Sequence, residues 1–190
     1  MSTVWVRRWT RQDYDRMIDV GLFPPGTRAE LLDGVVLEMS PQNSPHATAV
    51  CLVEEALRQV FRQGYHVRVQ LPLALDPLSE PEPDVAVVPG GPRDYRDHHP
   101  TAALLIVEVA DTTVTHDRNR KGSLYARSGI EEYWLVNLPA RRVEVYRHPV
   151  PQAEAYYGWA YASVRHVTAA DLLSPYAASE ALVAVADLLP

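Results

Sequence analysis

One segment, residues 102–110, constrains the fold more than any other part of the sequence. It is almost continuously apolar and carries a single charged residue, Glu108. Runs of this kind are typical of central strands that are buried on both faces of a sheet. Helical spacing follows over residues 115–128, and a second strand is expected at residues 132–137. The order strand, helix, strand predicts a right-handed βαβ unit.

The elements around this unit predict an α/β fold of the mixed α+β kind, in which helices flank a mixed β-sheet. Apolar residues recur at helical spacing over residues 46–63, which predicts the longest helix. Further strands are predicted by alternating or continuous apolar runs at residues 65–75, 83–88, 142–147 and 156–166. The central order is therefore α-β-β-β-α-β, with extra strands toward the C-terminus.

Two local signals define the N-terminal part of the chain. Asp33 and Gly34 form a dipeptide that favours a type I′ turn, which predicts a β-hairpin over residues 30–39. Thr10 and Asp13 have the spacing of a capping box, which predicts a short helix beginning after Thr10. An N-terminal hairpin is thus expected beside the central sheet.

Composition excludes several classes of protein. A length of 190 residues indicates a single domain, residues 1–190. The sequence has no run of 18 apolar residues, so no membrane span is predicted. The N-terminus lacks the apolar segment of a signal peptide, so we expect a cytoplasmic protein. The single cysteine, Cys51, has no partner for an internal disulfide and is expected to be buried beside the apolar stripe of its helix. A net charge of −6 argues against broad non-specific nucleic-acid binding and fits binding of divalent cations.

Two carboxylates lie where burial is expected. Asp84 begins a strand after a proline, and Glu108 interrupts the apolar strand. A buried carboxylate must be paired, hydrogen-bonded or bound to metal, and two carboxylates with waters are the usual protein contribution to a Mg²⁺ site. If the two strands are neighbours, both acids reach a common point. The alternatives are a turn cap at Asp84 and a buried ion pair of Glu108 with Arg118 or Arg120.

The helix after this strand supplies the third candidate, Lys121. Asp117, Lys121 and Tyr125 are spaced i, i+4 and i+8, which puts them on one face of the helix. Lys121 is the only lysine among 18 basic residues, so it is a candidate for a position that arginine cannot serve. Near a metal-bound water, its amine would orient the water or stabilise charge on a phosphate. The alternative is a solvent-exposed helix residue.

These residues resemble a known family. Pro83-Asp84, Glu108-Val-Ala and Lys121 look like the PD-(D/E)xK nuclease superfamily. In more detail, the chain resembles the Uma2-like (DUF820) group of proteins with the restriction-endonuclease-like fold. The stretches that carry the resemblance are Glu30-Leu-Leu-Asp-Gly, Ser44-Pro-His, Pro83-Asp-Val-Ala-Val-Val, Ile106-Val-Glu-Val, Asp117…Lys121…Tyr125 and Glu132-Tyr-Trp-Leu-Val.

The resemblance implies a metal-dependent endonuclease, a hydrolase of phosphodiester bonds with DNA as its substrate. It places the core at about residues 28–147 and leaves residues 148–190 as a strand-rich C-terminal extension. Asp84 and Glu108 would bind Mg²⁺ or Mn²⁺, with Lys121 as the third catalytic residue. One departure from the superfamily pattern is that the expected lysine position, two residues after Glu108, is Ala110. The resemblance implies that Lys121 supplies the amine instead.

Lesser candidates complete the predicted site. Glu30 could add a carboxylate, with solvation at a strand end as the alternative, and His46 could serve the site or only cap its helix. Asp117 and Tyr125 are expected to support the catalytic residues. Four late aromatic residues could stack on bases or pack on a sheet: Tyr156, Tyr157, Trp159 and Tyr161.

Two functions from different classes are compatible with the sequence. The first is the metal-dependent endonuclease. The second is a catalytically degenerate protein that keeps the nuclease fold and acts as an interaction module, which the acidic charge and the alanine at position 110 favour. A homodimer is compatible with both, since scission of two strands needs two sites.

Overall fold

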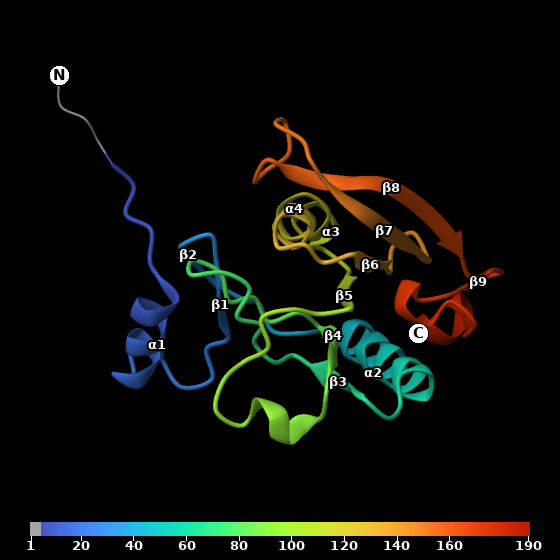
Figure 1. The fold of residues 1–190 in the computed structure, drawn as a ribbon, viewed down its shortest axis with the longest axis horizontal. Coiled ribbons are helices and arrows are strands. Elements are labelled where there is room, and N and C mark those ends of the chain that lie inside the picture. Colours follow the sequence, from blue (N-terminus) through green and yellow to red (C-terminus); the bar gives the residue numbers. More distant parts are fainter. Residues whose placement is uncertain (1–4) are drawn as a thin grey trace.

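A six-stranded mixed sheet forms the centre of the computed structural model, which describes residues 5–190 (Figure 1). The strands lie in the order β3-β4-β5-β6-β7-β8. Their bounds are β3 Tyr65–Val69, β4 Val85–Pro89, β5 Leu105–Ala110, β6 Glu132–Asn137, β7 Arg142–Pro151 and β8 Trp159–Thr168. Within this sheet β5 and β6 run parallel and the other neighbours run antiparallel, so the predicted mixed sheet and βαβ unit are confirmed.

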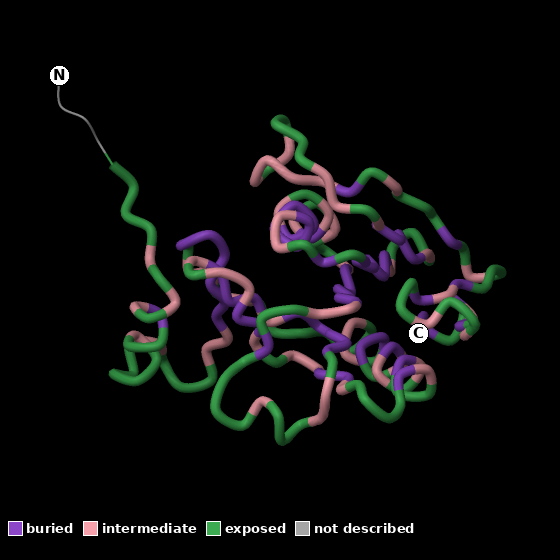
Figure 2. Tube along the Cα trace, in the orientation of Figure 1, coloured by how far each residue is buried: buried purple, intermediate pink, exposed green. Residues whose placement is uncertain are grey.

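Helices cover both faces of the sheet. The long helix α2 (Ser44–Val60) packs on one face together with the C-terminal 3-10 helix η4 (Val185–Leu188). The helix α4 (Gly122–Arg127) packs on the other face, beneath β7 and β8. All six residues of β5 are buried, as its apolar sequence predicts, and Figure 2 shows burial concentrated along the central strands.

Side-chain alternation along β5 assigns its residues to the two faces. Val107 and Val109 belong to the core cluster beneath α2, whereas Ile106 and Ala110 belong to the cluster beneath α4. Because successive side chains of a strand point to opposite faces, Glu108 points toward α4. The charged residue of the apolar run therefore lies between the sheet and this helix.

The N-terminal hairpin forms as predicted. It consists of β1 (Ala29–Leu32) and β2 (Val35–Glu38), and the φ angles of Asp33 (51°) and Gly34 (77°) are both positive, as a type I′ turn requires. Helix α1 (Arg11–Asp19) has the predicted capping box. Backbone hydrogen bonds in both directions join Leu31 to Glu80, which ties the hairpin to the segment that leads into β4.

The helical segment between β5 and β6 is less regular than its sequence predicts. It begins with α3 (Val114–His116), continues in a π-helical turn (Asp117–Lys121) and ends with α4. In the π turn the backbone N–H of Gly122 donates to the carbonyl of Asp117, five residues back. One wide turn thus interrupts the predicted helix, a feature that occurs often at functional sites.

Several predicted boundaries are corrected by the structure. The helix predicted at 46–63 spans Ser44–Val60, and the strand predicted at 65–75 ends at Val69 because Gln70 has a positive φ of 51°. The strand predicted at 156–166 begins at Trp159. Cys51 is exposed rather than buried, since its helix turns Val50 and Val53 toward the sheet instead.

The C-terminal part continues the central sheet. Strand β7 crosses residue 147, where the resemblance ends the core, and it pairs with β6 on one side and β8 on the other. The short strands β9 (Leu172–Leu173) and β10 (Val183–Ala184) form a separate pair. Short 3-10 helices occur at Pro92–Tyr95 (η1) and Tyr176–Ala178 (η3). None of the helices in residues 5–190 has the length and apolar character that crossing a membrane requires.

Candidate active site

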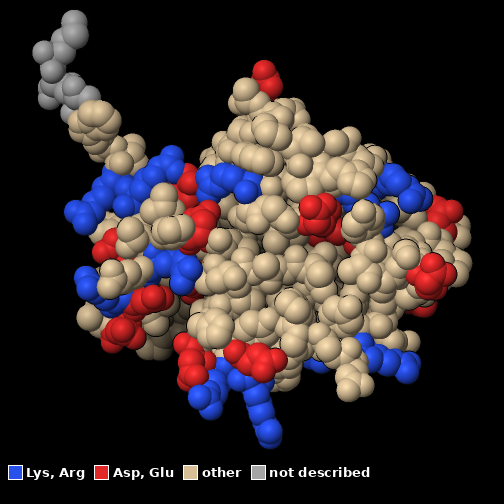
Figure 3. Space-filling model, in the orientation of Figure 1, with Lys and Arg blue, Asp and Glu red and all other residues tan. Residues whose placement is uncertain are grey.

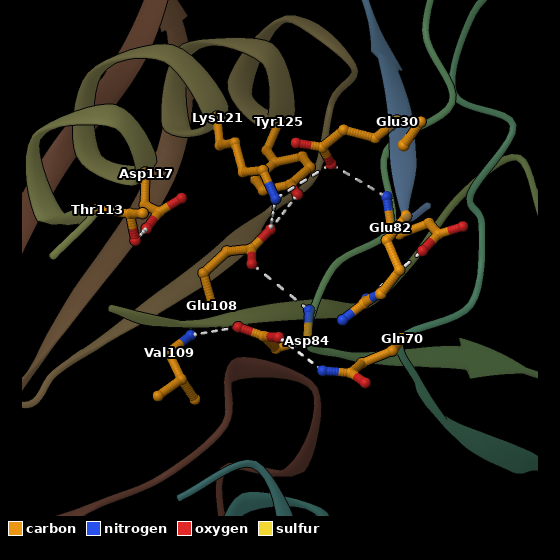
Figure 4. Close-up of polar contacts among 12 residues, drawn as sticks. Glu30, Gln70, Glu82, Asp84, Glu108, Val109, Thr113, Asp117, Lys121 and Tyr125 are labelled. Carbon is orange, nitrogen blue, oxygen red and sulfur yellow. Dashed lines mark hydrogen bonds and ion pairs between the residues drawn. The ribbon is translucent and has the colours of Figure 1, made fainter. Parts of the chain in front are cut away.

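Asp84 and Glu108 lie side by side on neighbouring strands. Val85 of β4 is opposite Val107 of β5 in an antiparallel pair, and continuing this register places Asp84 opposite Glu108 on the same face. The backbone N–H of Asp84 lies 3.4 Å from Glu108 Oε2, and Asp84 Oδ2 accepts a hydrogen bond from the backbone N–H of Val109 at 2.9 Å (Figure 4). The two acids are therefore neighbours on one face of the sheet, and the turn-cap alternative for Asp84 is wrong.

Lys121 reaches Glu108 from the opposite side. Its Nζ donates to Glu108 Oε1 at 3.0 Å and lies 3.2 Å from Glu30 Oε2. The hydroxyl of Tyr125 donates to the same Oε1 of Glu108 at 2.5 Å. Only 6% of the Lys121 side chain is exposed, so the alternative of a solvent-exposed helix residue is wrong.

The proposed ion pair of Glu108 with an arginine does not form. Arg118 makes a bidentate contact with Glu144 on β7, at 3.0 Å and 2.7 Å, and Arg120 donates to the hydroxyl of Tyr157 at 2.9 Å. The cation that pairs with Glu108 is the single lysine of the chain.

The hairpin and α2 bring two further predicted residues to the site. Glu30 on β1 is buried, which excludes strand-end solvation, and its Oε2 accepts from the backbone N–H of Glu82 at 3.3 Å. His46 Nε2 lies 3.2 Å from Asp84 Oδ2. The cap of α2 is Asn43, whose side chain accepts from the backbone N–H of His46, so His46 is not the capping residue.

Asp117 lines the same cleft, one turn before Lys121 in the helical segment. Its Oδ2 accepts a hydrogen bond of 2.5 Å from the hydroxyl of Thr113, a further turn earlier (Figure 4). Burial raises its pKa, and the charge of Lys121 only partly opposes this. The predicted helix face is therefore present, with Lys121 and Tyr125 at its centre and Asp117 at its edge.

Negative charge is in excess in this cluster. The cleft is lined by one lysine, two arginines and two histidines, against seven carboxylates: Glu30, Glu38, Glu82, Asp84, Glu108, Asp111 and Asp117. Burial raises the pKa of Glu108 to about 8, because neighbouring negative charges add to the effect and Lys121 only partly offsets it. Burial also raises the pKa of Glu82. A bound cation would stabilise the ionised form of such a cluster.

The other two central residues are held in their charged forms. Burial alone would raise the pKa of Asp84, but the hydrogen bonds and charges of His46, Val109 N–H and Lys121 outweigh it and lower the pKa. Burial alone would lower the pKa of Lys121, but the carboxylates of Glu108 and Glu30 lead a group that raises it well above its usual value. Lys121 is therefore a charged hydrogen-bond donor at neutral pH.

Two residues of the cluster are not predicted by the sequence reasoning. Gln70 donates from Nε2 to Asp84 Oδ1 at 3.2 Å, and its positive φ lets the chain turn after β3. The backbone N–H of Glu82 donates to the carboxylate of Glu30, and the side chain of Glu82 lies 3.5 Å from the guanidinium of Arg28. Glu82 could have been found from its position two residues before Asp84, but nothing in the sequence marks Gln70.

The donor set fits a metal that takes few protein ligands. Within residues 5–190, no group of three or more His, Cys, Asp or Glu side chains is arranged to hold a metal ion. Asp84 and Glu108 are instead a pair of carboxylates on one face of two neighbouring strands. Mg²⁺ and Mn²⁺ sites for phosphate chemistry commonly use one or two carboxylates, with waters and substrate oxygens completing the shell.

A cleft of about 800 Å³ opens over these side chains. Its walls come from the β1–β2 hairpin, the start of α2 and the α3–π segment, and its floor includes Asp84, Glu108 and Lys121. Arg28 and Arg120 also line it. The space is large enough to admit a phosphate with the groups attached to it.

Comparison with protein families gives one match that spans most of the chain. The Uma2 family, described as "Putative restriction endonuclease", matches residues 11–178. No protein with a curated description matches the chain.

Solved structures give a similar fold. A crystal structure described as "a putative nuclease belonging to DUF820" from Anabaena variabilis ATCC 29413 aligns with a TM-score of 0.67 at 17% identity, over 94% of this chain and 96% of that one. A type IIG restriction endonuclease, BpuSI, aligns with a TM-score of 0.37 at 20% identity, over 62% of this chain and 13% of that one. The first similarity confirms the predicted fold class, a mixed sheet flanked by helices.

Proposed function

The chain belongs to the Uma2 family, and from that premise we propose that it is a metal-dependent endonuclease that hydrolyses phosphodiester bonds in DNA. The observation that carries the proposal is the convergence of three side chains from separate elements. Asp84 before β4, Glu108 on β5 and Lys121 in the π turn meet in one cleft. The description of the family as a restriction endonuclease is what favours DNA over other phosphodiesters.

In this proposal Asp84 and Glu108 hold a Mg²⁺ or Mn²⁺ ion. Such an ion lowers the pKa of a bound water and offsets the charge that develops on the phosphate. The carboxylate of Asp84 is already ionised, because its hydrogen bonds lower its pKa. Glu108 is adjacent and accepts from both Lys121 and Tyr125 on one oxygen, which leaves Oε2 with the long contact to the backbone N–H of Asp84.

Lys121 acts as a donor rather than as a base. Its raised pKa keeps the amine protonated at neutral pH, so Nζ can hold the attacking water or bind a phosphate oxygen but cannot take a proton. During attack, negative charge grows on the phosphate oxygens, and a fixed ammonium group near them stabilises the transition state. Glu30 and Tyr125 position Lys121 and Glu108 relative to each other.

The acidic charge of the chain and the alanine at position 110 favour the alternative, a catalytically degenerate interaction module. The amine that Ala110 cannot supply is present at Glu108 through Lys121. This geometry supports the enzyme over the interaction module. A homodimer and a cytoplasmic location remain predictions from the sequence.

Calorimetric titration of Mn²⁺ into wild-type protein and Asp84→Ala tests the metal site without any choice of substrate. We expect binding in the wild type and loss of binding in the variant. Asp97→Ala is the matched control, because Asp97 is an exposed aspartate in the loop before β5 and should leave binding unchanged.

Cleavage is then measured on single-stranded, duplex and branched DNA with Mn²⁺. We expect Asp84→Ala and Lys121→Met to lose cleavage by at least about 100-fold, while Asp97→Ala cleaves like the wild type. Equal cleavage by wild type and Asp84→Ala would refute the proposed mechanism. Absence of both Mn²⁺ binding and cleavage in the wild type would favour the interaction module.

A further inference from the structure

The loop between β7 and β8, residues 152–158, carries an exposed aromatic residue at the edge of the active-site cleft. Tyr156 is 61% exposed and lines the cleft. It also lines a second cavity of about 800 Å³, which lies between the π–α4 segment and strands β7 and β8. Tyr156 and Asn119 are shared by the two cavities, so Tyr156 stands where a ligand would pass from one to the other.

The loop is fixed on α4 by hydrogen bonds. Ser123 Oγ accepts from the backbone N–H of Tyr157 at 2.8 Å and donates to the carbonyl of Trp159 at 2.7 Å. The guanidinium of Arg127 lies 4.9 Å from the ring centre of Tyr157. These contacts fix Tyr157 against α4, whereas the side chain of Tyr156 stays exposed to solvent.

Tyr156 has a defined orientation despite its exposure. Its ring meets the ring of Tyr157 edge-on at 4.8 Å between centres, and the guanidinium of Arg120 lies over the Tyr156 ring at 5.4 Å. A ring that is supported by neighbours and open to solvent suits stacking on a planar ligand, because little side-chain entropy remains to be lost.

Arg120 adds a positive charge beside this ring. Within the described part of the chain no carboxylate pairs with Arg120, and its Nε donates to the hydroxyl of Tyr157. In contrast, the other arginine of the cleft, Arg28, lies 3.5 Å from Glu82, and Lys121 is held by Glu30 and Glu108. Arg120 is therefore the cleft cation that remains available to an anionic ligand.

The net charge of the chain and the face drawn in Figure 3 do not favour tracking of duplex DNA. The chain has a net charge of −6, and Figure 3 shows positive side chains that are interspersed with negative ones and separated by neutral surface on the face drawn. A protein that binds a duplex through its backbone needs many phosphate contacts. Stacking on an aromatic ring supplies affinity without them, but it needs a base that is not already stacked within a duplex.

We propose that Tyr156 and Arg120 form a platform for an unpaired nucleotide of single-stranded DNA next to the scissile phosphate. Tyr156 stacks on the base, and Arg120 contacts a flanking phosphate. The strand runs from the cleft above Asp84 and Glu108, past Asn119, toward the second cavity. This inference rests on the proposed nuclease function and adds to it a preference for unpaired strands.

Fluorescence anisotropy with a short fluorescein-labelled DNA strand tests the platform in EDTA, where cleavage does not occur. The same strand is also measured as a blunt duplex and with abasic sites in place of its bases. Tyr156→Ala should bind the intact single strand about 5- to 150-fold more weakly than the wild type. Tyr156→Phe keeps the ring and should bind like the wild type.

The matched control is Tyr176→Ala. Tyr176 is 54% exposed and also has an arginine, Arg147, 5.6 Å from its ring centre, but it lines neither cavity. We expect Tyr176→Ala to bind like the wild type. With the abasic strand, wild type and Tyr156→Ala should differ little, because the base that Tyr156 contacts is absent.

Two results would overturn the platform alone: equal binding of the single strand by Tyr156→Ala and wild type, or tighter binding of the duplex by the wild type. In either case Asp84-dependent cleavage would still support the nuclease. If the wild type binds no DNA in EDTA but cleaves it with Mn²⁺, the platform is also wrong. Absence of Asp84-dependent cleavage on every substrate refutes the nuclease and the platform together.

Discussion

Replacing Glu108 by glutamine should stabilise the metal-free protein. The pKa of Glu108 is raised from 4.5 in the unfolded chain to about 8 in the folded protein, chiefly by burial. The folded state therefore binds the proton more tightly than the unfolded state. The contribution of protonated Glu108 to stability is fully retained below about pH 4.5. It is lost as the pH rises toward about 8, where Glu108 also ionises in the folded protein.

The size of the effect follows from this difference in pKa. The loss grows by about 1.4 kcal/mol for each pH unit, which amounts to about 3 kcal/mol at neutral pH. Glu108→Gln has the same shape, keeps an oxygen for the hydrogen bonds from Lys121 and Tyr125, and cannot ionise. We expect its stability advantage over the wild type to be small at about pH 5 and about 3 kcal/mol at about pH 7, or about 6–12 °C in Tm.

Urea denaturation in EDTA across this pH range measures the difference. Glu144→Gln is the matched control, since Glu144 is a buried glutamate on the same sheet face whose pKa is far below its usual value. Burial would raise that pKa, but hydrogen bonds from Arg118, Arg142, Tyr146 and Asn137 outweigh it. The stabilisation that ionised Glu144 contributes is present above about pH 4.5 and is lost only in acid. Glu144→Gln should therefore be less stable than the wild type by the same amount at about pH 5 and about pH 7.

Addition of Mn²⁺ should reverse the order of stability. A ligand at 1,000 times its Kd stabilises the folded state by about 4.1 kcal/mol, which exceeds the advantage of about 3 kcal/mol, and Glu108→Gln has lost one of the two carboxylates that would bind the ion. A stability difference between Glu108→Gln and wild type that does not change with pH would refute the electrostatic reasoning. An equal response of both proteins to Mn²⁺ would refute the assignment of Glu108 as a ligand.

Two further predictions concern the lysine and the core. Lys121→Arg should fold but lose DNA cleavage by at least about 100-fold, because a planar guanidinium does not fit the enclosed space between Glu30 and Glu108; a cleavage assay with Mn²⁺ checks this. Leu57→Ala, in the fully buried face of α2, should cost about 2–5 kcal/mol in urea denaturation without changing Mn²⁺ affinity measured by calorimetry.

The sheet could be predicted because its signals are local. The apolar run around Glu108 and the following helical spacing lie within residues 102–137, and they correctly define β5, β6 and the helical segment between them, though not the π turn within it. Asp33 and Gly34 likewise determine their turn through backbone preferences alone. Such patterns act over a few residues and need no knowledge of the rest of the fold.

The surroundings of the two central acids could not be predicted in the same way. Glu30 meets Lys121 across 91 positions of sequence, and this contact depends on the docking of the β1–β2 hairpin beside Glu80. Gln70 reaches Asp84 only because the chain turns sharply after β3. These contacts result from tertiary packing, which periodicity and turn preferences do not encode.

The packing of α4 on the sheet explains why position 110 is an alanine. Ala110 points to the same face as Glu108, is fully buried, and belongs to the apolar cluster that contains Tyr125 and Tyr133. A lysine there would have to place its charge within this cluster, at a high cost in desolvation. The helical segment supplies the charge instead, since Lys121 and Tyr125 donate to one oxygen of Glu108. The position of the amine thus depends on docking of α4, so changes that loosen this helix should reduce cleavage before they unfold the sheet.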